Sequence, residues 1–376
     1  QEQRFDTNPG PDQLAVRLGD YVMNGPWPSV GVVIPNHERL QELLEAITSV
    51  KEQRYKGHIC VYVVFQERPG VSNILSSLRH VVAIPYCDEE GRNPIAAKRN
   101  AGLSASTEDL VAFLDDDDIW HPLKLAAQVV ALQADDSISA IGTRATYFSG
   151  QPRWNYLSGG KGLRDRTVHR VISGRYIGTS SLLVGGETAR RLRFDERPEW
   201  IGVEDYDFKI RLSHIGPIRE LKGRYTAYRA DNASASLEER QLFLLRAVSV
   251  LATSVERDST RIFQQLLALR FLLISALGGY GAVQEFHGSY CQEAEELLDQ
   301  VLDGRLYGRL DPLVRHVVKT GWRRGWTAGP MRHIARTLRK VVVWLVRMAR
   351  SVSRQQSGSL WIPPCGQPRS RRRQGT

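Results

Sequence analysis

The stretch "AFLDDDDIWHPLKL", residues 112–125, joins an apolar run to four consecutive aspartates and then to a helix-like segment. Four adjacent carboxylates repel one another, so we expect the run to persist only where something cationic neutralises it. Hard divalent cations such as Mg²⁺ and Mn²⁺ prefer carboxylate oxygens, and they commonly bind through one or two carboxylates plus substrate phosphates. The run therefore indicates a metal site at the end of a strand.

Spacing within the run separates its carboxylates into two sets. If the backbone remains extended, Asp115 and Asp117 project to the same side, with Asp116 on the other. The alternative is structural: Asp118 caps the following helix and the other aspartates are solvated. Because one cap does not require four aspartates, the metal site is the favoured interpretation.

Apolar strands alternate with helical segments around this run. The sequence predicts strands at 30–34, 58–65 and 109–114, and helices at 40–50 and 93–106. Continuous apolar strands that alternate with helices imply an α/β fold with a mainly parallel sheet covered on both faces. In such sheets ligands bind beyond the carboxyl ends of the strands, where the acidic run lies.

The rest of the chain divides into segments of different character. "YIGTSSLLVGGE", 176–187, predicts another strand, and "GVEDYDFKIRLSHIG", 202–216, predicts a helix that begins with clustered acids. We expect four parts in chain order, which are an N-terminal arm at 1–28, the α/β domain at 29–236, a helical appendage at 237–311, and a basic amphipathic tail at 312–376.

Charge is distributed unevenly along the 376 residues. The formal net charge is +10, but 15 of the 51 Lys and Arg residues lie in 312–376, which has no Asp or Glu. The first 311 residues therefore carry 36 basic and 41 acidic residues. The slight excess of acidic residues in the first 311 residues argues against a nucleic-acid-binding protein. The tail at 312–376 alone has the positive charge that such a protein would use.

Cysteine usage and hydropathy indicate the compartment. The four cysteines lack the spacing of zinc ligands, so we expect free thiols in a reducing environment. The sequence shows neither a charged-then-apolar leader nor 18 uninterrupted apolar residues. We expect a cytoplasmic protein.

The order of four motifs resembles the family 2 glycosyltransferases of the GT-A fold. The motifs are "VVIPNHER" from residue 32, "AAKRNAGL" from 96, the aspartate run, and "GVEDYDFKIRLS" from 202. The resemblance covers about 29–236 and implies a metal-dependent, inverting transfer from a nucleotide-sugar to an acceptor hydroxyl. It also implies a GT-A, Rossmann-like mixed sheet, Mn²⁺ or Mg²⁺ as cofactor, and a role in envelope polysaccharide or glycolipid synthesis.

The same resemblance assigns roles to particular residues. Asp117 is expected to bind the metal, and Asp115 to contact the nucleotide ribose or the metal's surroundings. Glu204 and Asp205 are the expected catalytic pair, in which Asp205, the second acid, is the general base. The donor-binding set that the resemblance implies is Pro35, Asn36, Glu38, Gln66, Arg99, Asp115 and Asp116, of which Pro35, Asn36 and Glu38 are expected to line the pocket for the nucleotide base.

Two departures from the family pattern bear on specificity. Relatives often have an acid that recognises a uracil-like base after the second strand, but "FQERPG" places Gln66 there, so the expected UDP-sugar would be recognised without that acid. Gln can still donate and accept hydrogen bonds to a base. Relatives also have a metal-reaching His where "AYRADNASAS" has Asp231, which is either an oxygen ligand or an Asx-turn residue.

Residues 331–354 have the pattern of a basic amphipathic helix. Their apolar stripe recurs at steps of three and four residues and consists of Met331, Ile334, Leu338, Val341, Leu345, Met348 and Val352. Arginines lie on the opposite side, and Trp344 is present. We predict peripheral binding to an anionic membrane surface, on the inner face of the cell membrane. The alternative is that the stripe packs against the α/β domain.

Three other functions are compatible with parts of the pattern. A nucleotidyltransferase of similar fold also needs paired acids and a metal. The sequence does not show the Gly-rich phosphate loop usual in that group, and Glu204-Asp205 would have no catalytic role in it. A nucleic-acid-binding protein would use the basic tail. A non-catalytic scaffold would keep the fold but lack donor recognition at "FQERPG", and the presence of Asp115, Asp117 and Asp205 argues against it. The acceptor is not indicated by the sequence.

Overall fold

The computed structural model describes residues 27–150, 163–166 and 177–230, with positions 246, 247, 250 and 253. Its strands are β1 (Val30–Pro35), β2 (Ile59–Phe65), β3 (Val81–Pro85), β4 (Leu110–Phe113), β5 (Ile119–Trp120), β6 (Ala140–Phe148), β7 (Leu163–Arg166), β8 (Leu183–Gly185) and β9 (Ile218–Arg229). Its helices are α2 (Leu40–Lys51), α3 (Val71–Ser76), α4 (Pro94–Ala105), α5 (Lys124–Gln133), α7 (Gly186–Leu192) and α8 (Glu204–Ile215), with 3-10 turns η2 (Thr179–Ser181) and η3 (Pro198–Trp200).

The strands form one mixed sheet in the order β3-β2-β1-β4-β8-β6-β9-β5, with β7 paired to β9. β1 is parallel to both β2 and β4, and β2 is parallel to β3. β8 is antiparallel to β4 and to β6, so it separates this parallel half from β6 and β9, which are parallel to each other. The predicted mixed, mainly parallel sheet is confirmed.

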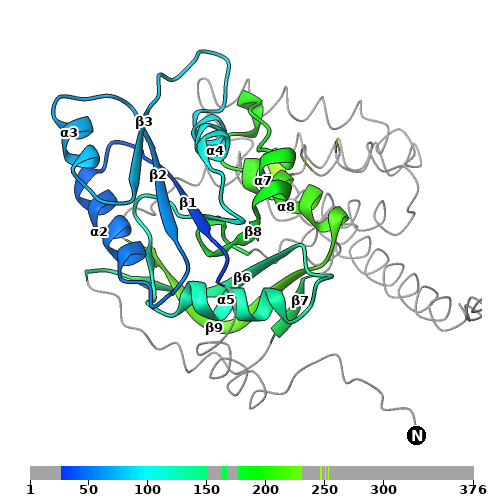
Figure 1. Ribbon diagram of the computed structural model, residues 1–376. Helices are drawn as coiled ribbons and strands as arrows, with labels where there is room; N and C mark the ends of the chain where they lie inside the picture. Colours follow the sequence, from blue (N-terminus) through cyan, green and yellow to red (C-terminus); the bar gives the residue numbers. More distant parts are fainter. Residues whose placement is uncertain are drawn as a thin grey trace, which may run out of the picture.

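Helices cover both faces of the sheet (Figure 1). On one face, alternate residues of β1, which are Val30, Val32 and Ile34, pack in one apolar cluster with buried residues of α2, α3 and α5. On the other face, Gly102 of α4 lies so close to Val33 that an added Cβ would come within 2.5 Å of it. Alternation of strand side chains between two helix layers explains why β1 is apolar at every position.

The structure confirms most of the predicted elements around the acidic run. The predicted helices at 40–50 and 93–106 correspond to α2 and α4, and the helix that begins with clustered acids corresponds to α8. The stretch 176–187 is only partly a strand, because Thr179–Ser181 form a 3-10 turn before β8. Small hydroxyl residues favour such turns over strands.

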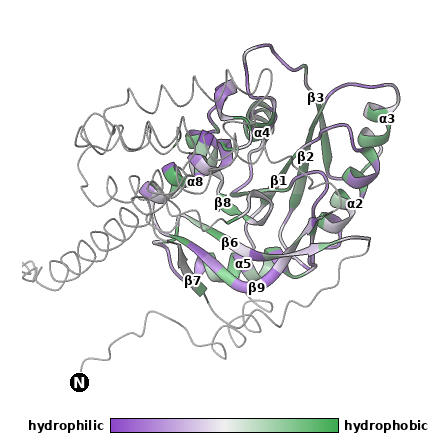
Figure 2. Ribbon diagram, turned by 180° about the vertical axis from the view of Figure 1, so that it is seen from behind, coloured by the Kyte–Doolittle hydropathy of each residue, from purple (hydrophilic) through white to green (hydrophobic). Residues whose placement is uncertain are grey.

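Sequence patterns did not indicate β3, β6 or β9. Figure 2 shows β1 to β3 in hydrophobic colours, whereas much of β9 is hydrophilic. The helical appendage at 237–311, apart from four positions, and the tail at 312–376 lie outside the described residues, as does most of the arm at 1–28. Among the helices that the structure describes, none is long and apolar enough to span a membrane.

Candidate active site

The four aspartates form a turn after β4 rather than an extended strand. The Asp118 amide donates to the Asp115 carbonyl over 3.1 Å, as in a β-turn. Burial nevertheless alternates, because the side chains of Asp115 and Asp117 are 38% and 19% exposed, whereas Asp116 and Asp118 are buried. The condition of an extended backbone is therefore not met, although exposure still alternates along the run.

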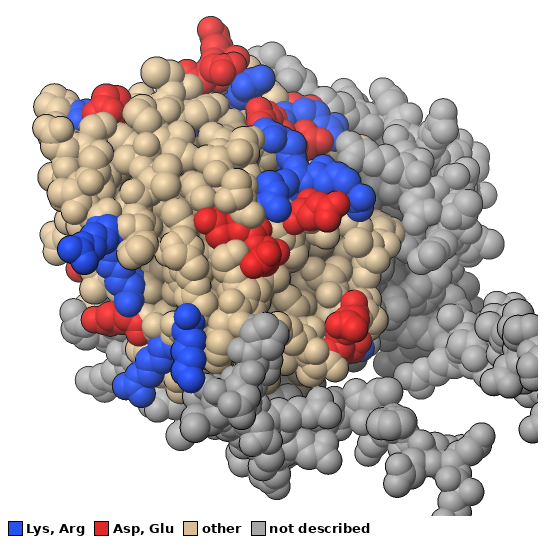
Figure 3. All heavy atoms as spheres, in the orientation of Figure 1, with Lys and Arg blue, Asp and Glu red and all other residues tan. Residues whose placement is uncertain are grey.

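Arginine side chains neutralise the exposed set. Arg99 Nη2 donates to Asp115 Oδ1 over 2.8 Å, and Arg39 forms an ion pair with Asp117. In the space-filling view, acidic and basic side chains lie interleaved near α4 and α7 (Figure 3). The expectation that something cationic accompanies the run is met by guanidinium groups, so the clustered charge does not by itself require a metal.

Asp116 joins the acidic turn to the loop after β1. Its Oδ2 accepts a hydrogen bond from Asn36 Nδ2 over 2.9 Å and another from the His37 amide over 2.6 Å. Burial raises the pKa of Asp116, although the His37 amide and the charge of Arg39 favour its ionised form. Asp116, predicted to bind the donor, thus positions the loop that carries two other predicted donor residues.

Asp118 does not cap the next helix. α5 begins at Lys124, and its N-cap residue, Leu123, makes no side-chain capping bond. Instead, Asp118 Oδ1 accepts from the Arg229 amide of β9 over 3.4 Å. Burial raises the pKa of Asp118, and the charge of Asp115 raises it further. The helix-capping alternative is therefore wrong.

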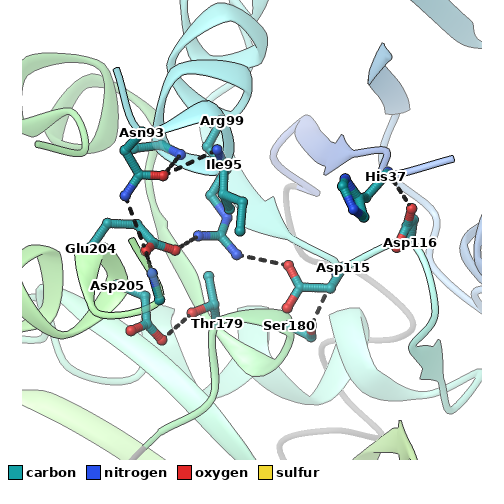
Figure 4. A network of polar contacts seen from close by, with 12 residues as sticks. His37, Asn93, Ile95, Arg99, Asp115, Asp116, Thr179, Ser180, Glu204 and Asp205 are labelled. Carbon is teal, nitrogen blue, oxygen red and sulfur yellow. Dashed lines mark hydrogen bonds and ion pairs between the residues drawn. The ribbon is translucent and has the colours of Figure 1, made fainter. Parts of the chain in front are cut away.

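Arg99 connects the aspartate turn to the acidic start of α8 (Figure 4). Its Nη1 donates to Glu204 Oε1 over 2.6 Å, and its Nη2 reaches Asp115. Burial alone would lower the pKa of Arg99, but the charges of Asp115 and Glu204 outweigh it and raise the pKa. The guanidinium is therefore a permanent buried cation between the two acidic motifs.

Asn93 fixes both ends of this connection. Its Oδ1 accepts from the amides of Ile95 and Ala96 over 3.1 and 3.2 Å, so it caps α4, the helix that carries Arg99. Its Nδ2 donates to Glu204 Oε2 over 3.4 Å. Glu204 also accepts from the Gly202 amide over 2.8 Å and is buried. Glu204 is thus enclosed by donors, whereas its neighbour is accessible.

Asp205 is the accessible carboxylate at the start of α8, with a side chain that is 21% exposed. Its Oδ2 accepts from Thr179 Oγ1 over 2.7 Å and from Lys209 Nζ over 2.6 Å. Burial would raise the pKa of Asp205, but Lys209, Thr179 and Arg99 outweigh it and lower the pKa. Sequence reasoning did not select Thr179 or Lys209. The signal for Lys209 was its i,i+4 spacing from Asp205 on one helix.

The residues predicted to line a base pocket surround the ends of β1 and β2. Pro35 and Asn36 are buried, and Glu38 and Gln66 are exposed. Glu38 has a φ of 67°, an uncommon value for a residue other than glycine, and it pairs with Arg68 over 3.0 Å. The loop after β1 and the segment after β2 are therefore linked across the predicted pocket.

Metal ligands can be placed only in part. Asp115 and Asp117 lie on the same turn, whereas Asp231 lies outside the described residues. Within the part of the chain that the structure describes, no three His, Cys, Asp or Glu side chains gather in a way that would hold a metal ion. A cavity of about 690 Å³ opens elsewhere, at the amino ends of β2 and β3, and none of the predicted site residues lines it.

Comparisons with known proteins agree with this arrangement. Residues 31–184 match the model of glycosyl transferase family 2. The chain is 28% identical over 202 residues to the amylovoran biosynthesis glycosyltransferase AmsB of Erwinia amylovora, a match that covers 50% of this chain and 65% of that protein. It is also 28% identical over 109 residues to an uncharacterized glycosyltransferase of Rickettsia felis, covering 29% of this chain and 18% of that one.

Solved structures show the same fold at low identity. S. aureus TarS 1-349 in complex with UDP aligns with a TM-score of 0.58 and 14% identity, covering 89% of this chain and 93% of that one. The same protein in complex with UDP-GlcNAc gives a TM-score of 0.58 at 14% identity, covering 86% and 92%. The sheet order, the match over 31–184 and the solved structures lead to one conclusion: the described part of the chain has the GT-A fold and is similar to glycosyl transferase family 2.

Proposed function

We propose that this protein transfers a sugar, with inversion, from a nucleotide-sugar to an acceptor hydroxyl. The observation that carries the proposal is the connection Asp115–Arg99–Glu204, with contacts of 2.8 and 2.6 Å. It joins the turn after β4, where a donor would bind, to the helix start that presents Asp205. A nucleotidyltransferase would have no use for an ionised base at that second position.

Asp205 is the general base in this proposal. It would take the proton of the acceptor hydroxyl while that oxygen forms a bond to the anomeric carbon from the face opposite the leaving group. The bond from that carbon to the diphosphate oxygen breaks, and the nucleoside diphosphate leaves with the electron pair. Partial exposure lets the acceptor approach, and the helix N-terminus favours the ionised carboxylate that a base must be.

The oxygen ligands at the strand end fit Mn²⁺ or Mg²⁺. Asp115 and Asp117 would hold the ion, each sharing its carboxylate with Arg99 or Arg39. Tyr228 Oη supports the fit, because it is buried without a hydrogen-bond partner in the described part of the chain. Burial and the charges of Asp118, Asp115 and Asp205 raise its pKa, so it faces the acidic site as a neutral hydroxyl. A bound divalent cation would stabilise the charge on the departing diphosphate.

The loop after β1 supports a nucleotide-sugar as the donor. Asn36 is held by Asp116, and its carbonyl accepts from the buried Lys98 over 3.4 Å, so the loop has a fixed shape against which a base can bind. Gln66 is exposed at the end of β2 and can donate to or accept from a base. TarS binds UDP and UDP-GlcNAc in its solved complexes, which makes a UDP-sugar the first donor to test.

The acceptor side supports a role in envelope polysaccharide or glycolipid synthesis. AmsB is a glycosyltransferase of amylovoran biosynthesis. The amphipathic pattern at 331–354 would bring the enzyme to an anionic membrane surface, where such acceptors lie. Residues 331–354 lie outside the described residues, so this part of the proposal rests on their sequence.

A nucleotide-sugar screen by thermal denaturation tests the donor. A ligand at 100 times its Kd stabilises the native state by about 2.7 kcal/mol, so the correct donor should raise the Tm, and more so with Mn²⁺. The screen should compare UDP-, GDP- and other nucleotide-sugars. If no nucleotide-sugar stabilises the protein with or without Mn²⁺, the proposed donor site is wrong.

Asp117→Asn is expected to abolish turnover and to weaken Mn²⁺ binding. The change removes a charged ligand but keeps the size of the side chain, and Asp117 is exposed enough for the fold to tolerate it. Mn²⁺ binding can be followed by electron paramagnetic resonance, without turnover. The matched control is Asp136→Asn, an exposed carboxylate after α5. Wild-type activity in the presence of a chelator would contradict the metal assignment.

A further inference from the structure

Both contacts to the Asp205 carboxylate converge on one oxygen. Thr179 Oγ1 donates to Oδ2 over 2.7 Å, and Lys209 Nζ donates to the same atom over 2.6 Å. Within the part of the chain that the structure describes, no hydrogen bond or ion pair falls on Oδ1. Since the side chain is partly exposed, Oδ1 is the oxygen on which an incoming hydroxyl can place its proton.

Lys209 is a buried cation held in place from two sides. Its side chain is 3% exposed, and Nζ also donates to the Ile177 carbonyl over 2.9 Å. It lies four residues after Asp205 on α8, a spacing at which helical side chains meet. Because Ile177 lies just before η2, Lys209 ties the helix to the turn that carries Thr179.

Core side chains hold Thr179 and its turn. Trp120 Nε1 donates to the Ser180 carbonyl over 2.7 Å, and Gln128 Nε2 donates to the Ser181 carbonyl over 2.8 Å. Both donors are buried, as are all three residues of η2. The Ser180 hydroxyl also accepts from the Asp115 amide over 3.1 Å. The turn therefore has fixed contacts with the core, with the aspartate turn and with Asp205.

We propose that Thr179 and Lys209 are positioning residues that hold Asp205 by Oδ2 and direct Oδ1 toward the acceptor hydroxyl. This inference rests on the proposed function. During transfer the hydroxyl proton passes to Oδ1 as the new glycosidic bond forms, and the carboxyl group later releases it to solvent. Contacts on Oδ2 persist through this cycle, because neither Thr179 nor Lys209 has to give up a proton.

Among the residues that the structure describes, three other ionisable groups lie near Asp205 and bear on its pKa. They are Arg99 on α4, Glu204 beside it on α8, and Tyr228 on β9. Arg99 favours the ionised form and Glu204 disfavours it, while Tyr228 is neutral below its raised pKa. Because none of them bonds to Asp205, Lys209 provides the nearest compensating charge.

Lys209→Met removes the charge and keeps a long side chain, so it separates the ion pair from packing. An opposite charge beside an aspartate lowers the pKa of that aspartate by about 1 to 3 units. Removing the Lys209 charge should therefore move the acidic limb of the plot of kcat against pH to higher pH by about that amount. The direction follows because a base works only when ionised. Lys209→Arg, which keeps the charge, should restore the wild-type limb.

Thr179→Val removes the hydrogen bond without changing the size of the side chain, and Thr179→Ser retains the hydroxyl. We expect kcat to fall at least about tenfold in the Val variant, with little change in the KM of the donor, because a hydrogen bond to a charged group is lost, and we expect kcat to recover in the Ser variant. The pair remains informative if Lys209→Met does not fold. Equal kcat in the Val and Ser variants would overturn the role of Thr179.

Titration by ¹³C NMR of labelled aspartate carboxyl groups separates this inference from the proposed function. The Asp205 signal is assigned with Asp205→Asn and needs no turnover. An upward shift of its midpoint in Lys209→Met supports the inference even if no sugar is transferred, in which case the proposed function fails alone. The role of Lys209 would be overturned if, in Lys209→Met, neither the titration midpoint of Asp205 nor the acidic limb of kcat against pH differed from that of the wild type.

Discussion

Asp205→Asn is expected to lower kcat by about 10² to 10⁴, the usual contribution of a positioned general base. The amide cannot accept the acceptor's proton, yet it keeps the size of the side chain and can still accept hydrogen bonds from Thr179 and Lys209. Donor binding, measured by calorimetry, should be unchanged, because the contacts proposed for the donor lie on the loop after β1 and on the aspartate turn.

Glu204→Gln is the matched control for that measurement. Glu204 is buried among Arg99, Asn93 and the Gly202 amide, so its loss should appear mainly in stability. If the Gln variant lost its turnover at unchanged Tm while Asp205→Asn remained active, the base would be Glu204.

Arg99→Met is expected to lower the free energy of unfolding by about 3 to 5 kcal/mol, the usual cost of removing one partner from a buried ion pair. Glu204 would keep its charge in a buried position, with only Asn93 and the Gly202 amide to compensate it. Urea denaturation at constant pH measures the change as a lower midpoint with unchanged slope.

Arg79→Met provides the comparison, because Arg79 is exposed before β3 and should change stability by less than about 0.5 kcal/mol. A comparable decrease in the free energy of unfolding in both variants would mean that Arg99 contributes no more to stability than an exposed arginine does. A loss confined to Arg99→Met would show that the two acidic motifs depend on one shared cation.

The fold was predictable where burial on both faces dictates the residue type. β1 and β2 lie between two helix layers, so every position is apolar and the pattern is clear. β9 was not predictable, because it pairs with β5, β6 and β7 through a sequence that mixes Arg, Glu and Lys with Ile and Tyr. Partial exposure removes the alternation on which such a prediction depends.

The site was predictable where the residues concentrate charge within a few positions. The aspartate run and Glu204-Asp205 could be found in this way, but their partners could not. Arg39 lies 78 residues from Asp117, and Thr179 lies 26 residues from Asp205, so only the folded chain brings each pair together. Charge alone favoured a metal as the neutralising cation, whereas the structure shows that arginines already provide compensation.

The connection through Arg99 also limits how the two halves of this domain can be recombined with those of relatives. The aspartate turn and Arg99 come from the half of the domain before α5, and Glu204 comes from the half after it. A chimera that exchanged the later half with a relative lacking an acid at that position would leave the buried Arg99 guanidinium with Asp115 as its one remaining carboxylate partner among the residues described. Exchanging the later half between relatives therefore requires Arg99 and Glu204 to be inherited together, because removing one partner of a buried ion pair is strongly destabilising.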